Sequence, residues 1–354
     1  MDPKSKIYVA GHTGLVGSAL IRKLKDKGYE NLIVREHPSL DLTRQKEVEE
    51  FFKKEKPEYV FLAAARVGGI LANNTYKADF IYDNLAIALN VIHSAYKYGT
   101  VKLLNLGSSC IYPKLAPQPI KEEYLLKDYL EPTNEPYAIA KIAAIKLCRY
   151  FNEQYGTNFI SIMPTNLYGP NDNFNLETAH VLPALIRKFI IARNLSEEKY
   201  DFIVRDIQRF PLGFGYNPDK NNNDIHDIIN FLEKIGITAN AVTLWGTGTP
   251  YREFLYVDDL ADAGLFLMEK YDYKTIGELV NVGTGKDSTI AEIATLVKKI
   301  TGFNGEIRWD RTKPDGTPRK LLDVSKLHNL NWKSSINLEQ GIRLTIDWYN
   351  SQIK

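Results

Sequence analysis

The stretch KIYVAGHTGLVGSALIRKLKDKG, residues 6–28, decides the fold of this chain of 354 residues. A short apolar run (6–11) leads into three glycines with the spacing Gly-x-x-Gly-x-x-Gly, and a helix-length segment (18–28) follows. Glycine allows the backbone to turn tightly and lets the helix pack closely against the preceding strand. The stretch therefore predicts a strand, a glycine turn and a helix in direct succession.

Four more short apolar runs follow in the first half of the chain. Each is bounded by turn residues and is apolar on both faces, which is typical of a buried parallel strand. They are NLIV (31–34), YVFLAAA (59–65), KLLNLGSS (102–109) and FISIMPTN (159–166). Helix-length segments such as QKEVEEFFKKEK (45–56) separate them. Strands that alternate with helices predict an α/β fold built on a doubly wound parallel (Rossmann) sheet.

The strict alternation stops after residue 166, where prolines, asparagines and aromatic residues become more frequent. This change predicts two domains. The Rossmann domain comprises residues 1–165 and part of 250–285. A smaller, discontinuous α/β domain, made of residues 166–250 and 286–354, binds the substrate.

Residues 190–242 are interpreted as an insertion in the smaller domain. The segment 190–210 is helix-like, and 224–236 has apolar residues at helical spacing. Between them, 210–223 is rich in glycine, proline and asparagine, which predicts a loop or a disordered tip.

The composition excludes several classes of protein. The 45 basic and 43 acidic residues are interspersed and leave a net charge of +2, so nothing indicates a nucleic-acid partner. Two cysteines cannot form a disulfide framework and are typical of a reducing compartment. No apolar run approaches the roughly 20 residues of a membrane helix, and MDPKSKIYVAG lacks a signal core. We expect a cytoplasmic protein with no membrane segment and no metal site.

The glycine turn predicts a dinucleotide site. Gly11, Gly14 and Gly17 let the backbone approach a diphosphate, and the helix that starts there directs its N–H groups at the anion. Cofactor choice is usually made at the end of the second strand, where Arg35 and His37 can meet a 2′-phosphate. Glu36 can instead accept a hydrogen bond from a ribose hydroxyl. We expect NADP, with NAD as the alternative.

The segment NEPYAIAKIAAIKLC (134–148) predicts a helix that carries an acid–base pair. Tyr137 and Lys141 are four residues apart and so lie on one face. A free tyrosine has a pKa of about 10, and a nearby ammonium is expected to lower it. Ser108, at the end of a predicted strand, can donate a hydrogen bond to a reacting carbonyl oxygen.

The glycine turn, Ser108 and the Tyr137–Lys141 pair together resemble the extended short-chain dehydrogenase/reductases that act on nucleotide sugars. Longer phrases narrow the resemblance to the GDP-L-fucose synthase family, over almost the whole chain except residues 190–242. These phrases are AGHTGLVGSA, AAARVGGILANNTYKADFIYDN, GSSCIYPK, EPTNEPYAIAKIAAIKLC, MPTNLYGPNDNF, HVLPALIRKF, WGTGTPYREFLYVDDLADA and KPDGTPRKLLDVSKL.

The resemblance implies an enzyme that epimerises GDP-4-keto-6-deoxy-D-mannose at C3 and C5 and then reduces C4 with NADPH, giving GDP-L-fucose. It assigns the proton exchange at C3 and C5 to Cys110 and His180. If residues 106–110 are extended, Ser108 and Cys110 face the same side. A C4 reductase of a related GDP-4-keto-6-deoxy sugar such as a heptose, with or without epimerisation, is the alternative.

The same resemblance assigns the binding residues. The substrate meets Lys188, Trp245, Arg252 and Asp315. The cofactor meets Gly11, His12, Thr13, Gly14, Leu15, Val16, Gly17, Arg35, His37, Leu106, Gly107, Ser108, Ser109, Lys141, Pro164, Thr165, Asn166, Leu167 and His180. Thr13 and His37 stand where relatives often carry arginine, which weakens the case for NADP. Analogy with the superfamily predicts a homodimer through the helix that carries Tyr137 and its neighbour.

Overall fold

The computed structural model describes residues 1–217 and 224–353, which form two compact units. Unit 1 consists of Met1–Leu167, Glu253–Lys286 and Leu321–Ser335. Unit 2 consists of Tyr168–Arg252, Asp287–Lys320 and Ile336–Lys354. The sequence placed all of 286–354 in the smaller domain, whereas the structure groups 321–335 with unit 1. The assignment of the units to cofactor and substrate stays a prediction.

Unit 1 is built on a six-stranded sheet with the order β2-β1-β3-β4-β5-β9, and every neighbouring pair is parallel. This confirms the predicted doubly wound parallel sheet. The strands are β1 (Ile7–Ala10), β2 (Leu32–Ile33), β3 (Tyr59–Leu62), β4 (Lys102–Leu106), β5 (Phe159–Pro164) and β9 (Val280–Val282). The first five coincide with the five apolar runs.

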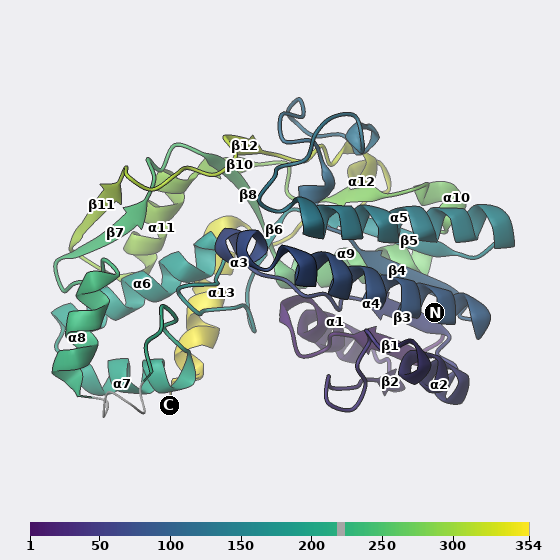
Figure 1. The fold of residues 1–354 in the computed structure, drawn as a ribbon, viewed down its shortest axis with the longest axis horizontal. Helices are drawn as coiled ribbons and strands as arrows, with labels where there is room; N and C mark the ends of the chain where they lie inside the picture. Colours follow the sequence, from purple (N-terminus) through teal and green to yellow (C-terminus); the bar gives the residue numbers. More distant parts are fainter. Residues whose placement is uncertain (218–223, 354) are drawn as a thin grey trace. The chain divides into compact units, whose positions relative to one another are not determined.

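Helices cover both faces of this sheet (Figure 1). Alternate residues of β1 point to opposite faces, as the two-residue period of a strand requires. Ile7 and Val9 join a core with α1 and α9, while Tyr8 and Ala10 join a core with α2 and α4. The helices of unit 1 are α1 (Leu15–Asp26), α2 (Gln45–Glu55), α3 (Ile70–Thr75), α4 (Lys77–Lys97), α5 (Glu135–Tyr155), α9 (Val257–Lys270), α10 (Tyr273–Ile276) and α12 (Ser325–Asn329).

Unit 2 combines helices with short strands. Strands β7 (Ala241–Trp245) and β11 (Glu306–Asp310) form a parallel pair, and β12 (Arg319–Lys320) pairs with Tyr251 and Arg252. The helices are α6 (Val181–Ser196), α7 (Tyr200–Arg209), α8 (Ile225–Lys234), α11 (Ile290–Thr301) and α13 (Leu338–Ser351). Strand β10 (Asp287–Thr289) also lies in unit 2, whereas β6 (Asn166–Tyr168) and β8 (Tyr251–Tyr256) contain residues of both units.

The helices predicted within 190–242 are present as the second half of α6, α7 and α8. Of the predicted loop or disordered tip at 210–223, residues 218–223 lie outside the described residues. The interpretation of 190–242 as an insertion stays a prediction.

A buried ion pair organises the interior of unit 2. The guanidinium of Arg187, on α6, lies 2.8 Å from a carboxylate oxygen of Asp206, and both side chains are completely buried. Arg187 also donates hydrogen bonds to the carbonyl oxygens of Phe174 and Phe210, and Tyr349 donates to Asp206. Because a buried charge is stable only when it is paired and hydrogen-bonded, this network ties α7, α13 and the segment before α6 to that helix.

Two features are absent from the part of the chain that the structure describes. None of its helices has the length and apolar character needed to cross a lipid bilayer. It also contains no group of three or more histidine, cysteine, aspartate or glutamate side chains placed to hold a metal ion.

Candidate active site

The glycine turn lies at the carboxyl end of β1. Gly11 has a φ of +80°, which favours glycine, and a Cβ on this residue would lie 2.9 Å from the backbone nitrogen of Ala64. A Cβ on Gly17 would lie 2.0 Å from the carbonyl oxygen of Gly11. The turn, the first turn of α1 and the segment after β3 therefore approach more closely than any side chain permits.

The geometry of this turn fits a dinucleotide. Strand β1 has β2 on one side and β3 on the other, so the connections after β1 and β3 diverge there, and ligands of such sheets bind at this point. Helix α1 begins just after Gly14, which has no side chain to cap the free N–H groups. The Nδ1 atom of His12 is buried and has no hydrogen-bond partner among the described residues. These groups can hold a diphosphate.

Arg35 is already engaged. Its guanidinium lies 2.7 Å from a carboxylate oxygen of Glu55 and 5.5 Å from the centre of the Phe51 ring, both on α2. His37 is 83% exposed, with its Nε2 atom 3.8 Å from a carboxylate oxygen of Asp41. A 2′-phosphate would therefore meet His37 readily, whereas it would have to compete with Glu55 for Arg35.

Sequence reasoning missed the segment that follows β3. Ala64 lies against Gly11, and the side chain of Asn84, on α4, donates hydrogen bonds to the carbonyl oxygens of Arg66 and Phe80. The Asn84 oxygen in turn accepts from the Arg66 N–H. Asn84 thus fixes the chain at the carboxyl end of the strand next to β1. The run YVFLAAA could have indicated this segment, because a parallel strand ends at the edge of the sheet where ligands bind.

The chain leaves β4 in a tight turn. Ser108 caps a short 3₁₀ helix, η1 (Ser109–Ile111), and its hydroxyl oxygen accepts a hydrogen bond of 3.4 Å from the Cys110 N–H. The expectation of extended geometry through Cys110 is therefore wrong, because this cap bends the chain directly after Ser108. The Ser108 hydroxyl accepts this bond and can still donate its own hydrogen, and Cys110 is 8% exposed.

The structure brings Tyr137 and Lys141 together on α5. The Lys141 ammonium lies 5.6 Å from the centre of the Tyr137 ring and donates a hydrogen bond of 2.9 Å to the carbonyl oxygen of Leu106. The Tyr137 ring also packs edge-on against Phe80, with ring centres 6.4 Å apart. The pair is thus held at the point where β4 ends and the Ser108 turn begins.

The electrostatics of this pair differ from the sequence-based expectation. Burial raises the pKa of Tyr137 above its ordinary value, and a smaller contribution from Cys110 raises it further. Burial lowers the pKa of Lys141 to about 8, against a smaller opposing contribution from Cys110. The expected lowering of the tyrosine pKa is therefore wrong for this structure, because desolvation is the largest contribution to both shifts. Cys110 lies within electrostatic reach of both residues.

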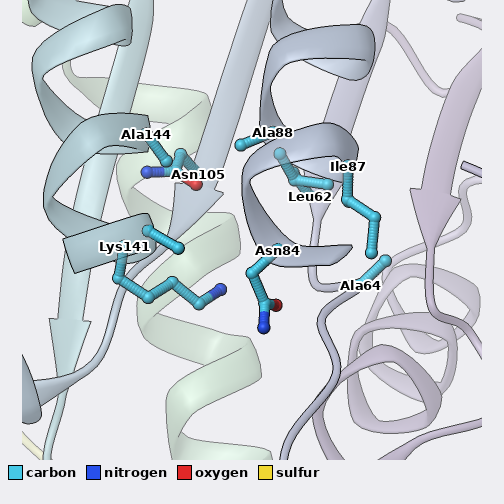
Figure 2. A pocket seen from close by; sticks show the side chains of 9 residues that line it. Leu62, Ala64, Asn84, Ile87, Ala88, Asn105, Lys141 and Ala144 are labelled. Carbon is cyan, nitrogen blue, oxygen red and sulfur yellow. The ribbon is translucent and has the colours of Figure 1, made fainter. Parts of the chain in front are cut away.

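A cavity of about 10 Å³ lies beside Lys141 and has room for about one water molecule (Figure 2). Polar side chains of Asn84 and Asn105 share its wall with apolar ones. Among the described residues, Lys141 forms no ion pair, and its ammonium donates its hydrogen bond to a backbone carbonyl. The lining residues are Leu62, Ala64, Asn84, Ile87, Ala88, Asn105, Ala140, Lys141 and Ala144.

The predicted cofactor residues after β5 are anchored by one backbone carbonyl. The Thr165 hydroxyl (3.2 Å) and the Asn166 amide nitrogen (2.8 Å) both donate hydrogen bonds to the carbonyl oxygen of Glu253. This contact fixes the orientation of the Asn166 amide. Pro164 ends β5, and Leu167 is partly buried against the core of unit 1.

Two predicted site residues lie at or on α6 of unit 2, His180 directly before the helix and Lys188 within it. His180 is the residue before the helix, and its side chain makes no capping bond. Its pKa lies below the ordinary value because protein atoms displace water around the ring, which favours neutral imidazole, although the residue is exposed. Burial lowers the pKa of Lys188 to about 8, and its ammonium donates a hydrogen bond to the carbonyl oxygen of Thr243. The approach of His180 to Cys110 stays a prediction.

The other predicted substrate-binding residues differ in their solvent exposure and in the hydrogen bonds that they already make. Trp245, at the end of β7, is 56% exposed, with the Lys313 ammonium 5.5 Å from its ring. Burial lowers the pKa of Arg252, which forms no ion pair with a described carboxylate. Asp315 uses both carboxylate oxygens to accept hydrogen bonds from Thr247, so it ties the loop between β11 and β12 to the loop between β7 and β8. Trp245 is thus exposed to a ligand, whereas the Arg252 guanidinium donates hydrogen bonds to the carbonyl oxygens of Tyr251 and Thr317.

Comparison with known families identifies the chain. The family described as "NAD dependent epimerase/dehydratase family" matches the sequence over residues 7–204 and 207–283. The chain belongs to this epimerase/dehydratase family. A GDP-L-fucose synthase of Arabidopsis thaliana is 53% identical over 348 residues, which cover 98% of this chain and 94% of the relative.

Solved structures of other proteins resemble this epimerase/dehydratase over its whole length. A GDP-6-OMe-4-keto-L-xylo-heptose reductase from C. jejuni is 42% identical, with a TM-score of 0.91 and 99% of each chain covered. A GDP-mannoheptose C4 reductase from Campylobacter jejuni with NADP bound is also 42% identical, with a TM-score of 0.86 and the same coverage.

Replacing Gly17 with alanine is expected to lower the free energy of unfolding by about 3 kcal/mol, because backbone atoms leave no room for the new Cβ. Gly14→Ala is the matched control, since a Cβ there would lie 3.6 Å from the Gly11 oxygen, an ordinary contact. Urea unfolding of the two variants measures the difference. Equal stability would contradict the close approach of the turn.

The turnover rate at saturating substrate should fall as the pH rises through about 8, since Lys141 is an ammonium below this pKa and neutral above it. Tyr137 keeps its proton in this range because its pKa is raised. Lys188 titrates in the same range, so the kcat profile must be separated from the KM profile. Lys141→Arg keeps a positive charge and should shift the fall to higher pH; a wild-type kcat that stays level above pH 8 would contradict the assignment.

Proposed function

We propose that this epimerase/dehydratase converts GDP-4-keto-6-deoxy-D-mannose to GDP-L-fucose, by epimerisation at C3 and C5 and NADPH-dependent reduction at C4. The observation that carries the proposal is the cluster of Ser108, Cys110, Tyr137 and Lys141 around the end of β4. The 53% identity to a GDP-L-fucose synthase supports the same substrate.

Epimerisation needs protons to leave and return at the two carbons beside the ketone. Removal of the proton at C3 or C5 moves an electron pair onto the C4 oxygen and gives an enolate. The hydroxyls of Ser108 and Tyr137 donate hydrogen bonds to that oxygen and stabilise its charge. Cys110 and His180 form the proposed pair that takes a proton from one face and delivers one to the other. Neutral His180, favoured by its lowered pKa, is suited to accept the proton.

Reduction follows at C4 of the same ring. When bound, NADPH supplies the hydride that adds to the carbonyl carbon. Tyr137 transfers its phenolic proton to the C4 oxygen, and the ammonium of Lys141 stabilises the phenolate that remains. Burial, which raises the pKa of Tyr137 in the free protein, keeps that proton in place until the oxygen becomes basic. Gly11, Gly14 and Gly17 would hold the cofactor diphosphate, and His37 its 2′-phosphate.

A heptose substrate is the second candidate, since two reductases with heptose names resemble the chain at TM-scores of 0.91 and 0.86. We favour the hexose because Cys110 and His180 are both retained, and a reductase without epimerisation would not need them. The relative named for fucose is also more similar in sequence, at 53% against 42% identity.

We also propose that unit 1 binds the cofactor, that unit 2 binds the GDP-sugar and that the enzyme acts in the cytoplasm.

A homodimer through α4 and α5, which lie side by side in unit 1, completes the proposal (Figure 1). Both helices carry exposed apolar or aromatic residues, among them Tyr82 and Leu89 on α4 and Ile139 and Tyr150 on α5. Analytical ultracentrifugation of the wild type and of Ile139→Glu tests this contact.

Incubation of the purified protein with NADPH and GDP-4-keto-6-deoxy-D-mannose should yield GDP-L-fucose. Proton NMR of the product reports the configuration at C3, C4 and C5 together, and the loss of NADPH absorbance gives the rate. A parallel reaction with the corresponding heptose is the control for substrate choice. A product reduced at C4 with unchanged C3 and C5 would overturn the epimerase half of the proposal, and faster turnover of the heptose would overturn the hexose.

Cys110→Ser should abolish the uptake of deuterium from D₂O at C3 and C5, because the alcohol is far less acidic than the thiol. Tyr137→Phe should instead block reduction and leave a measurable exchange. Cys148→Ala is the matched control, since this second buried cysteine lies in the core and burial raises its pKa to about 12. Wild-type exchange in the Cys110 variant would refute its assignment.

A further inference from the structure

Asn134 holds an unused hydrogen-bond acceptor at the start of α5. It is the residue before the helix, and its side chain makes no capping bond. Its amide oxygen is buried and has no hydrogen-bond partner among the described residues. An unpaired buried oxygen is unfavourable unless a water molecule or a ligand supplies the missing hydrogen bond.

Other helices of the chain use their capping side chains in the ordinary way. The Asn337 oxygen accepts a hydrogen bond of 2.9 Å from the Gln340 N–H, and Thr289 accepts one from the Glu292 N–H. An asparagine before a helix normally accepts from the second or third helical N–H group. In α5 the second position is Pro136, which has no N–H, and the third is Tyr137. The Asn134 oxygen is therefore not occupied by its own helix.

The position of Asn134 connects it with the catalytic pair. Side chains on a helix lean toward its N-terminus, so the Tyr137 ring lies over the turn that begins with Asn134. The Tyr137 ring also packs edge-on against Phe80, and a Cβ on Gly68 would lie 3.2 Å from the Phe80 ring.

A second buried amide oxygen without a partner among the described residues belongs to Asn73, on α3. Asn73 is 6% exposed, its amide nitrogen donates to the carbonyl oxygens of Gly68 and Gly69, and its amide oxygen has no partner among the described residues. Asn73 is thus linked to the Tyr137 ring through Gly68 and Phe80. Acceptors of this kind match a ligand that brings several hydroxyl groups, as a sugar ring does.

We propose that the Asn134 amide oxygen accepts a hydrogen bond from the sugar hydroxyl on C3, next to the ketone. The inference rests on the proposed function, in which Tyr137 binds the C4 oxygen. A C3 hydroxyl lies one carbon from that oxygen, and Asn134 lies in the helical turn that the Tyr137 ring covers. Asn134 is then a substrate-binding residue that selects sugars with this hydroxyl.

The test compares GDP-4-keto-6-deoxy-D-mannose with the same keto sugar lacking the C3 hydroxyl, by NADPH oxidation with wild type and Asn134→Ala. The wild-type preference in kcat/KM for the hydroxylated sugar should fall by about tenfold in the variant, the size of one net hydrogen bond. NADPH affinity, measured by fluorescence titration, should stay unchanged. The same preference in both proteins would overturn the proposal.

Two further variants separate this role from a structural one. Asn337→Ala removes a side chain that does cap its helix, so it should lower thermal stability and leave the substrate preference unchanged. Asn134→Ser restores a good helix cap with a shorter side chain; it should lose the preference and keep its stability. Wild-type preference in the serine variant would overturn the proposal. Failure of the wild type itself to turn over the hydroxylated sugar would instead overturn the proposed function, and this assignment with it.

Discussion

The hydrogen bond from the Lys141 ammonium to the Leu106 carbonyl oxygen joins α5 to the end of β4 and sets the position of the candidate catalytic residues. Burial of the Lys141 ammonium lowers its pKa to about 8, since a backbone dipole replaces only part of the lost hydration. Lys102, at the other end of the same strand, is also buried with a pKa of about 8. It donates to the carbonyl oxygens of Leu267 and Met268, near the end of α9. The two lysines have the same chemistry, and only Lys141 lies at the carboxyl edge, where ligands of a parallel sheet bind.

Glu253 is a buried acidic residue of unit 1, and its negative charge is held by backbone N–H groups as the charges of the two lysines are held by carbonyl oxygens. It is completely buried, and its carboxylate accepts hydrogen bonds from the backbone N–H groups of Thr284, Gly285 and Leu322. Burial raises the pKa of Glu253 and these bonds oppose the rise. The contact with Leu322 helps to hold 321–335 in unit 1, although that segment follows a stretch of unit 2. Domain boundaries drawn from changes in local composition could not place this segment in unit 1, because the contact joins residues 69 positions apart in the sequence.

The sequence predicts local structure in this chain better than it predicts side-chain contacts between residues that are far apart in the sequence. The strand, turn and helix of 6–28 follow from spacing alone, and so does the shared face of Tyr137 and Lys141. KLLNLGSS, by contrast, is predicted as a strand over residues 102–109, whereas β4 ends at Leu106 and the Ser108 hydroxyl caps η1. The pairing of Arg35 with Glu55, 20 positions away, is also invisible in the sequence, and so is the desolvation that raises the pKa of Tyr137. Each miss concerns a side chain whose partner or solvent exposure depends on the folded chain.

The two cysteines illustrate why burial by itself does not reveal function. Cys110 and Cys148 are both buried, and both belong to segments that contact α5 or form part of it. Cys148 lies in the core between helices and sheet, where burial raises its pKa to about 12, so it keeps its proton at neutral pH. Cys110 lies in the turn after β4 and acts electrostatically on both Tyr137 and Lys141. A thiol can exchange protons with a ligand only where the ligand binds, and in a parallel sheet that place is the carboxyl ends of the strands. Cys110 follows the carboxyl end of β4, whereas Cys148 lies in the middle of α5.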